Sequence, residues 1–415
     1  MNIFIVNHYA TPPSLGGLVR HYYFSKNLRA EGHDVRILSA SQIHNSDLNF
    51  REQGQLMTEK DVDGVPYSFV RTISYSKNNW RRIFNMMQFP INVVKVIKEL
   101  NKKGEKPDVI YLSSPTPFAC YTVIRYAKKN KIPCAMEVRD LWPLSIVNFN
   151  HISNNNPIIK ILYQLEKWLY KNTNRLIFTM SGGKQYIIDQ GWDNQIDLNK
   201  VTQINNGIDL AEFESNKQNF YLEDEDLDNP NYLKIVYTGS VRHIYQLQMI
   251  VETAKLCQMN LPNVRFFIFG DGPERENLEN LSKEYQLNNI YFKGRIPKKY
   301  IASVLSRADI TLLHSKQVDL NKYGISQNKL FEYAAVKKPI LSTIQEHDSI
   351  INKYHCGIQI NNQNEKEIYE AIKQFTNLSQ EDRDQMGENA YLLAQNHDYK
   401  ELTKQLLDVL NSLIA

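Results

Sequence analysis

The stretch Tyr323-Gly324-Ile325-Ser326-Gln327-Asn328-Lys329-Leu330-Phe331-Glu332-Tyr333-Ala334-Ala335-Val336-Lys337-Lys338-Pro339-Ile340-Leu341 predicts a loop, a helix and a buried strand. Gly324 permits a tight turn, and Ser326 is a good N-cap with Lys329 at the third helical position. Pro339 ends the helix, whose apolar face is formed by Leu330, Phe331, Ala334 and Ala335.

The start of this helix has the chemistry of a nucleotide site. The first turn of a helix offers N–H groups and a partial positive charge, which suit a phosphate. Lys329 adds a full positive charge, and Glu332 can accept hydrogen bonds from a ribose diol. The stretch therefore predicts a nucleoside diphosphate site. The alternative is an ordinary strand–helix unit with a polar cap.

Length and composition indicate a globular protein of two domains. The chain has 415 residues, of which 42% are hydrophobic and 23% are charged, and this length suits two α/β domains. A net charge of +4 is too small to indicate a general nucleic-acid binder.

Cysteine usage and the N-terminus predict a cytoplasmic protein. The cysteines are scattered and indicate neither a zinc site nor a disulfide framework: Cys120, Cys134, Cys257 and Cys356. Residues 3–6 suit a buried strand and follow no basic leader. No apolar run reaches the roughly 18 residues of a transmembrane helix.

The first half of the chain predicts a parallel sheet. A strand at residues 3–6, a loop with Gly16 and Gly17, a helix at 18–30 and a strand at 33–39 make a βαβ unit. The loop lacks the G-x-G-x-x-G dinucleotide fingerprint. A later strand ends in Arg139 and Asp140, and charged groups at the carboxyl ends of parallel strands belong to the active-site edge.

Residues 66–135 are strongly basic. They carry a local charge of +10 against +4 for the whole chain. Basic residues alternate with Trp80, Phe84 and Met87, ahead of a helix expected at 91–100. This composition resembles a surface that rests on anionic lipid. A solvated helix face with core aromatics is the alternative. Residues 45–63 are expected to be a polar excursion.

The βα pattern restarts after an acidic, polar segment. Strands are expected at 233–238, 264–269, 290–293 and 308–314. We therefore expect an N-terminal domain over 1–210, a linker over 211–231 and a C-terminal domain over 232–395. Asp224-Glu225-Asp226 in the linker is interpreted as solvated chain rather than as a metal site.

Eight short segments, in this order, resemble one enzyme family: residues 16–17, 139–143, 206–209, 237–240, 269–273, 293–297, 308–309 and 326–339. The family is the retaining, nucleotide-sugar-dependent glycosyltransferases of the GT-B fold with an E-x7-E motif. Within it, the chain is most similar to bacterial transferases of O-antigen and capsule assembly. The resemblance covers nearly the full length.

The resemblance implies an α/β fold of two Rossmann-like parallel-sheet domains facing across a cleft. The N-terminal domain would hold the acceptor, the C-terminal domain the nucleotide sugar, and a last helix at about 399–415 would pack back on the first domain. The reaction implied moves a hexose or N-acetylhexosamine, with UDP as the commonest nucleotide, to a hydroxyl of a lipid-linked or glycan acceptor. A polyprenyl-diphosphate-linked glycan at the inner face of the plasma membrane would suit the basic region.

The resemblance also implies the site residues. The expected catalytic residues are Asp140, Arg139, Arg242 and Lys329. The expected substrate-binding residues are His8, Gly16, Gly17, Gly239, Gly270, Asp271, Gly272, Arg295, Ile296, Ser326, Asn328, Leu330 and Glu332. No metal or other cofactor is expected, because cationic side chains would stabilise the diphosphate. Asp140 could instead be a helix N-cap, and His8 a packing residue at a strand end.

The chain departs from the family at two positions. Gly324 stands where the first Glu of the motif is expected, and Leu247 stands near the position of a second basic residue after Arg242. Two competing functions therefore stay open: a nucleotide-sugar epimerase of the same architecture, and an inactive binding subunit of a glycan-assembly complex.

Overall fold

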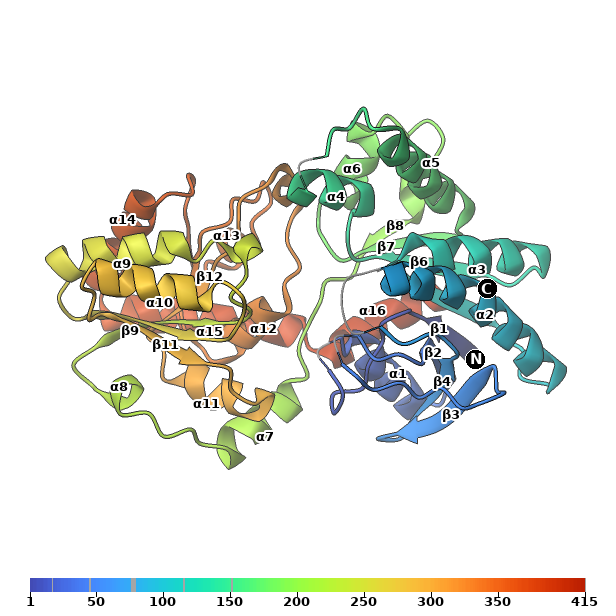
Figure 1. The fold of residues 1–415 in the computed structure, drawn as a ribbon, viewed down its shortest axis with the longest axis horizontal. Helices are drawn as coiled ribbons and strands as arrows, with labels where there is room; N and C mark the ends of the chain where they lie inside the picture. Colours follow the sequence, from blue (N-terminus) through green and yellow to red (C-terminus); the bar gives the residue numbers. More distant parts are fainter. Residues whose placement is uncertain (17, 45, 76–79, 115, 151, 415) are drawn as a thin grey trace. The chain divides into compact units, whose positions relative to one another are not determined.

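The structure is a computed structural model that describes residues 1–415 except 17, 45, 76–79, 115, 151 and 415. The chain forms two compact units (Figure 1). Unit 1 comprises Met1–Asn205 and Tyr399–Ala415, and unit 2 comprises Asn206–Asp398. The predicted α/β fold with two Rossmann-like parallel sheets is confirmed.

Unit 1 is built on one sheet with the strand order β3-β4-β2-β1-β5-β6-β7-β8 among its described residues. Its neighbouring strands run parallel, except β3 and β4. The strands are β1 Asn2–Val6, β2 Asp34–Ala40, β3 Met57–Val62, β4 Val65–Val70, β5 Val109–Ser113, β6 Cys134–Val138, β7 Arg175–Phe178 and β8 Val201–Gln203.

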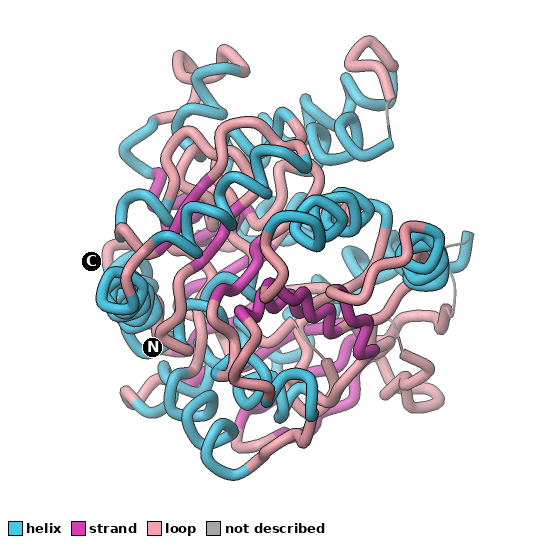
Figure 2. The backbone as a smooth tube through the Cα atoms, turned by 90° about the vertical axis from the view of Figure 1, so that its left-hand side faces the viewer, coloured by secondary structure: helices cyan, strands magenta, loops and turns pink. Residues whose placement is uncertain are grey.

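Helices lie beside the strands, as the cyan and magenta segments of Figure 2 show. In unit 1 they are α1 Arg20–Ala30, α2 Trp80–Lys102, α3 Pro117–Lys129, α4 Trp142–Asn150, α5 Pro157–Asn172, α6 Gly183–Asp189, a 3-10 turn η1 Leu198–Lys200, and α16 Tyr399–Asn411.

The C-terminal helix α16 completes the core of unit 1. It lies against α1 (Figure 1, red and blue), where the ring of Tyr399 stacks on Tyr23 with centroids 4.8 Å apart. Leu402 and Leu406 are fully buried with Leu28 of α1. The last helix therefore belongs to the first unit, although the whole of unit 2 separates it from α1 in the sequence.

Two expectations for unit 1 were wrong. Part of the expected polar excursion is β3, which forms an antiparallel hairpin with β4. Asp63 and Gly64 make the turn with φ of 53° and 78°, a geometry that the Asp-Gly pair favours. Helix α2 begins at Trp80 rather than at 91, and it continues through Pro90.

Unit 2 is a second parallel sheet, with the order β11-β10-β9-β12-β13-β14 among its described strands. Buried apolar residues pack on both of its faces. The strands are β9 Leu233–Thr238, β10 Val264–Phe269, β11 Ile290–Gly294, β12 Ile310–Leu313, β13 Ile340–Ser342 and β14 Gly357–Gln359. The helices are α7 Leu210–Asn219, α8 Glu225–Asp228, α9 Gln248–Asn260, α10 Arg275–Glu284, α11 Ile301–Ser306, α12 Asn328–Ala335, α13 Ile350–Tyr354, α14 Glu365–Asn377 and α15 Gln380–Asn396, with 3-10 turns η2 His243–Tyr245, η3 Lys298–Tyr300 and η4 Asp319–Tyr323.

The segment expected to be a linker is instead part of unit 2. Residues 211–231 include most of α7 and all of α8, and Phe213 and Leu227 are buried in the core of the unit. Its acidic run is not merely solvated chain, because Lys293 Nζ lies 2.8 Å from Asp224 Oδ1 and 2.7 Å from Asp226 Oδ2. These carboxylates anchor the segment to β11.

Candidate functional site

Glycines shape the loops at the carboxyl end of the sheet in unit 2. The N–H of Gly239, after β9, donates to the carbonyl of Phe269 at 2.9 Å, and the N–H of Gly270 donates to the carbonyl of Gly294 at 2.8 Å. A Cβ atom on Gly270 would lie 1.6 Å from the oxygen of Gly239, and one on Gly272 2.1 Å from the oxygen of Val241. These positions need glycine because the loops pack directly on one another.

Helix α12 is fastened to the end of β9 by one buried tyrosine. The hydroxyl of Tyr333 accepts a hydrogen bond from the N–H of Thr238 at 2.9 Å and donates to the carbonyl of Thr238 at 3.2 Å. Leu330, Phe331, Ala334 and Ala335 are buried beneath the helix, as their spacing predicted. The first turn of α12 is therefore held beside the glycine loops.

Lys329 projects from that first turn between two aromatic rings. Its Nζ lies 3.2 Å from the hydroxyl of Tyr237, and 4.3 Å and 4.4 Å from the ring centroids of Tyr237 and Tyr245. Burial lowers the pKa of Lys329 to about 7, and the charge of Glu332 opposes this shift only in part. Among the described residues no carboxylate forms an ion pair with this ammonium group, and a diphosphate would supply that anionic partner.

Glu332 follows Lys329 by three residues on the same helix. Its side chain is partly exposed. Burial of the carboxyl raises its pKa, against the charges of Lys298 and Lys329. Residues three apart lie on one face of a helix, so a cation and a hydrogen-bond acceptor face the same side. That pairing suits the diphosphate and the ribose of one nucleotide.

Ser326 has a different role from the one predicted. Helix α12 begins at Asn328, its N-cap is Gln327, and no side chain caps it. The hydroxyl of Ser326 instead accepts a hydrogen bond from the N–H of Asn206 at 3.0 Å, and the side-chain amide of Asn206 donates to the carbonyl of Ser326 at 2.5 Å. Asn206 thus fixes the loop that enters α12. The sequence pointed to Asn206 through the 206–209 segment of the family resemblance, but it did not predict this contact with Ser326.

The other predicted residues of unit 2 differ in how accessible they are. The side chains of Arg242, Asp271, Arg295 and Asn328 are exposed, and Ile296 is partly buried against the core. Leu330 cannot bind substrate as predicted, because its side chain is fully buried and its N–H donates to the carbonyl of Gln327 at 3.1 Å.

In unit 1, His8 is a buried packing residue. It is 1% exposed, and its ring lies against Phe89 with centroids 4.5 Å apart. Asn85 donates its amide N–H to the carbonyl of Ile73 at 2.7 Å, so its Oδ1 accepts from Nε2 of His8, also at 2.7 Å. Burial lowers the pKa of His8 to about 3, which keeps the ring neutral.

Arg139, Asp140 and Gly16 lie at loops of unit 1. Asp140 is exposed two residues before α4, and Arg139 Nε lies 4.0 Å from Glu137 Oε1. Gly16 is exposed, whereas Gly17 lies outside the described residues.

Of the predicted site residues, the structure brings five together at one edge of unit 2: Gly239, Gly270, Gly272, Lys329 and Glu332.

Sequence reasoning missed the role of Glu137. This fully buried carboxylate accepts hydrogen bonds from Arg20 Nε at 2.7 Å, from Ser113 at 3.0 Å and from the hydroxyl of Tyr111. His21 Nε2 lies 3.3 Å away. Despite its burial, the charges of Arg20 and His21 hold its pKa well below the usual range. In the sequence, the position of Glu137 near the end of β6 was the signal that could have indicated this role.

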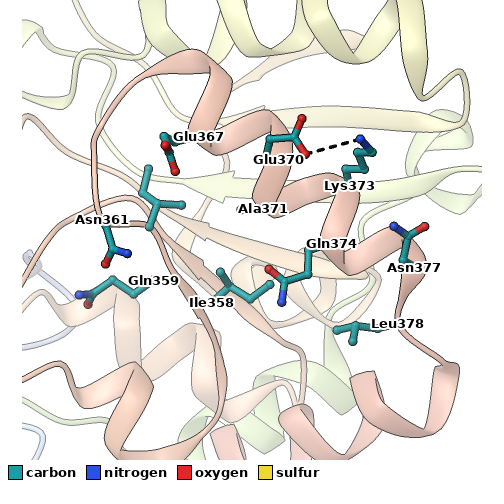
Figure 3. Close-up of a pocket in the computed structure, with 11 residues that line it drawn as sticks. Ile358, Gln359, Asn361, Glu367, Glu370, Ala371, Lys373, Gln374, Asn377 and Leu378 are labelled. Atoms are coloured by element: carbon teal, nitrogen blue, oxygen red, sulfur yellow. Dashed lines mark ion pairs between the residues drawn. The ribbon is translucent and has the colours of Figure 1, made fainter.

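Among the described residues, no three His, Cys, Asp or Glu side chains gather where they could hold a metal ion. An open groove of about 510 Å³ lies between β14 and α14 (Figure 3), but none of the predicted site residues lines it. Its polar wall includes the Glu370–Lys373 ion pair, whose atoms are 3.6 Å apart.

Both units match models of glycosyltransferase families. Residues 222–393 match the model "Glycosyl transferases group 1", and residues 15–212 match "Glycosyltransferase Family 4". An uncharacterized glycosyltransferase of Methanocaldococcus jannaschii is 18% identical over 97% of this chain and 96% of its own.

Solved structures give the same fold. HepE of Anabaena, solved with UDP and glucose, is 15% identical with a TM-score of 0.66, and the alignment covers 100% of both chains. WaaG, a glycosyltransferase involved in lipopolysaccharide biosynthesis, is 16% identical with a TM-score of 0.64 over 98% of this chain and 99% of its own. With glycosyltransferase models matching both parts of a chain that has two parallel-sheet domains of the GT-B type, the protein is a glycosyltransferase, and its second unit resembles the glycosyl transferases group 1.

Proposed function

We propose that the protein transfers a sugar from a UDP-sugar to a hydroxyl of a lipid-linked or glycan acceptor, with retention of the anomeric configuration. The observation that carries the proposal is the pair Lys329 and Glu332 on the first turns of α12, beside the loops of Gly239 and Gly270. In this proposal Lys329 binds the diphosphate, and Glu332 accepts hydrogen bonds from the ribose.

The proposed step balances without an added reactant. The acceptor oxygen bonds to the anomeric carbon as the bond from that carbon to the β-phosphate oxygen breaks. The acceptor proton passes to an oxygen of the leaving diphosphate on the same face. Charge accumulates on the diphosphate, and preorganised cations stabilise such charge most effectively. Lys329 and Arg242 are proposed for this role in place of a metal ion.

A hexose or N-acetylhexosamine is the proposed sugar, and UDP the proposed nucleotide. HepE, which shares the fold, was solved with UDP and glucose. Among the solved structures with this fold, WaaG is described as involved in lipopolysaccharide biosynthesis. These likenesses support a role in bacterial surface polysaccharide synthesis as part of the proposal.

The acceptor is proposed to be a polyprenyl-diphosphate-linked glycan, reached by binding to an anionic membrane surface. No helix among the described residues is long and apolar enough to cross a bilayer. Helix α2 instead has an outer face with apolar side chains that are 47–68% exposed: Trp80, Ile83, Phe84, Met87 and Ile91. At the same helical spacing this face continues with exposed Lys95, Lys98 and Lys102.

This α2 outer face has the composition of an interfacial helix. Apolar side chains at spacings of three and four residues suit insertion at the level of the lipid headgroups, and the following lysines suit anionic phosphates. Arg81 also lies over the ring of Trp80, 5.7 Å from its centroid. The proposed location is therefore cytoplasmic and peripheral, at the inner face of the plasma membrane.

The activity test uses the purified chain with UDP-glucose, UDP-N-acetylglucosamine and their GDP counterparts. UDP release that requires a polyprenyl-diphosphate-linked sugar acceptor would support the proposal, and NMR of the product would give the anomeric configuration. Conversion of the donor to its epimer without an acceptor would indicate an epimerase instead. UDP binding without release under any condition would indicate a binding subunit.

The membrane test is flotation with vesicles of phosphatidylglycerol and phosphatidylcholine. We expect the chain to float with the anionic vesicles at low salt, and Phe84→Ser with Ile91→Ser to reduce flotation. Met259→Ser is a matched control, because Met259 is an exposed apolar residue of unit 2. Equal flotation of all variants, or none at low salt, would contradict the proposed membrane face.

A further inference from the structure

The loop after β13 places a buried carboxyl group against the entrance of α12. Glu346 is 6% exposed, and its Oε2 accepts a hydrogen bond from the N–H of Ile325 at 2.9 Å. Ile325 lies between Gly324 and Ser326, directly before the turn that carries Lys329. The carboxyl group thus belongs to unit 2 and borders the proposed nucleotide site.

The second oxygen of this carboxyl group is unsatisfied. Within the described chain, Oε1 of Glu346 is buried and has no hydrogen-bond partner. The same is true of Oε1 of Gln327, on the other side of Ser326. Buried acceptors usually have a donor, and an exception requires an explanation. These two acceptors lie beside the same loop, where hydroxyl groups of a bound ligand would supply the donors.

The side chain of Glu346 is not needed to fasten its own loop. Gln317 makes two hydrogen bonds with the backbone of Gln345, at 2.8 Å and 3.1 Å, and Gln359 donates to the carbonyl of Glu346 at 3.3 Å. Burial and nearby Asp348 raise the pKa of Glu346 to about 8. At neutral pH the carboxyl group of Glu346 therefore keeps its proton, whereas the paired Glu137 is ionised.

Backbone geometry explains why a carboxylate would come from this loop. Gly324 has a φ of 93°, a conformation that side chains other than glycine rarely adopt. A glutamate at position 324 would strain the turn. Glu346 reaches the same turn from a neighbouring strand end without any strain at 324.

We propose that Glu346 accepts hydrogen bonds from ring hydroxyls of the transferred sugar, after a rotation about its side-chain bonds, and that Gln327 assists it. This inference rests on the proposed function, because it assigns the sugar half of the same site. The ligand class is the polyhydroxylated ring attached to the β-phosphate. The contact would select among donor sugars, whereas the nucleotide half would bind without it.

The test compares Glu346→Gln, Glu346→Asp and the control His347→Asn in the full chain. Glutamine keeps an acceptor for Ile325 but puts an amide donor in place of the second oxygen, and His347 is an exposed neighbour. Calorimetry gives the Kd for UDP, and steady-state kinetics give kcat and KM for UDP-sugars. For Glu346→Gln we expect an unchanged Kd for UDP and a fall of about 10- to 100-fold in kcat/KM for the preferred sugar.

The outcomes separate this inference from the proposed function. Partial recovery in Glu346→Asp and no loss in His347→Asn would support it. Wild-type kinetics in Glu346→Gln, with an active wild-type enzyme, would overturn the inference and leave the proposed function intact. Equal loss of UDP binding and turnover in Glu346→Gln would assign it a purely structural role. Failure of the wild-type chain to bind UDP or any UDP-sugar would overturn both.

Discussion

Glu137 of unit 1 and Lys329 of unit 2 are both charged groups near the carboxyl end of a parallel sheet, but their surroundings differ. Glu137 is enclosed by Arg20, Ser113 and Tyr111, and its pKa is held low by charges that compensate its burial. Lys329 has a tyrosine hydroxyl and two ring faces, and burial lowers its pKa to about 7. A satisfied charge stabilises the fold, whereas an unsatisfied one is available to a ligand.

The largest effect is expected from breaking the satisfied network. Arg20→Met would leave Glu137 buried beside His21, and it would remove the donors to the carbonyls of Ile204 and Asn205. Loss of one partner of a buried ion pair costs about 3–5 kcal/mol. Denaturant unfolding, followed by a probe in unit 1, measures it. Lys404→Met removes the exposed pair with Glu401 and should leave the unfolding midpoint unchanged. Equal unfolding midpoints for Arg20→Met and Lys404→Met would show that the buried network around Glu137 stabilises the fold no more than an exposed ion pair does.

A smaller effect, on function rather than stability, is expected from the unsatisfied charge. Lys329→Met keeps an unbranched side chain between Tyr237 and Tyr245 but removes the cation. If Lys329 binds the diphosphate, the donor KM should rise and kcat fall, for a loss of about 30- to 150-fold in kcat/KM, or roughly 2–3 kcal/mol. Unchanged kcat and KM would remove Lys329 from the site. Thermal unfolding of the variant provides the folding control.

Much of the fold was predictable, because continuous apolar runs and glycine loops mark the parallel strands of both units. The hairpin of β3 was not, since the solvent-exposed half of that strand has the composition of a loop. Nor was the start of α2, because Pro90 ordinarily ends a helix, yet here it lies within one. Tertiary packing overrode the local signal in each case.

The geometry of the candidate site was predictable where it depends on one helix, and less so where it depends on contacts between distant segments. The spacing of Lys329 and Glu332 follows from the helix alone. The contacts of Ser326 with Asn206, 120 residues earlier, and of Ile325 with Glu346 follow only from folding. Leu330 was misassigned because a motif position does not reveal whether a side chain faces the core or the solvent.

The low pKa of Lys329, which sets it apart from Glu137, predicts how UDP binding depends on pH. The pKa of Lys329 is about 7 without ligand, and a bound diphosphate should raise it. Above pH 7, binding of UDP would then take up a proton, and affinity would fall by up to about tenfold per pH unit, or 1.4 kcal/mol. Calorimetry in buffers of different ionisation enthalpy measures the proton. Lys329→Arg, which stays protonated, should abolish the uptake. Proton release, or none at pH 8, would contradict the assignment.

The smallest effect is expected where a charged cluster is satisfied but partly exposed. Lys293→Met would separate Asp224 and Asp226 from β11. Since the Lys293 side chain is 21% exposed, solvent screens the interaction, and the loss should be about 1 kcal/mol or less. Urea unfolding of unit 2 measures it at low and high salt. A loss of unfolding free energy as large as that of Arg20→Met would show that solvent exposure does not determine how much these charged networks stabilise the fold.

The placement of α16 has a consequence for how the protein is made. The ribosome completes the first 398 residues before it adds the helix that covers Tyr23 and Leu28. Unit 2 lies wholly within the sequence and can fold as soon as it emerges. Unit 1 must wait with an open hydrophobic face until α16 has been synthesised. A stop codon directly after residue 398 would therefore damage the amino-terminal unit, and chaperones would bind that unit in its incomplete form.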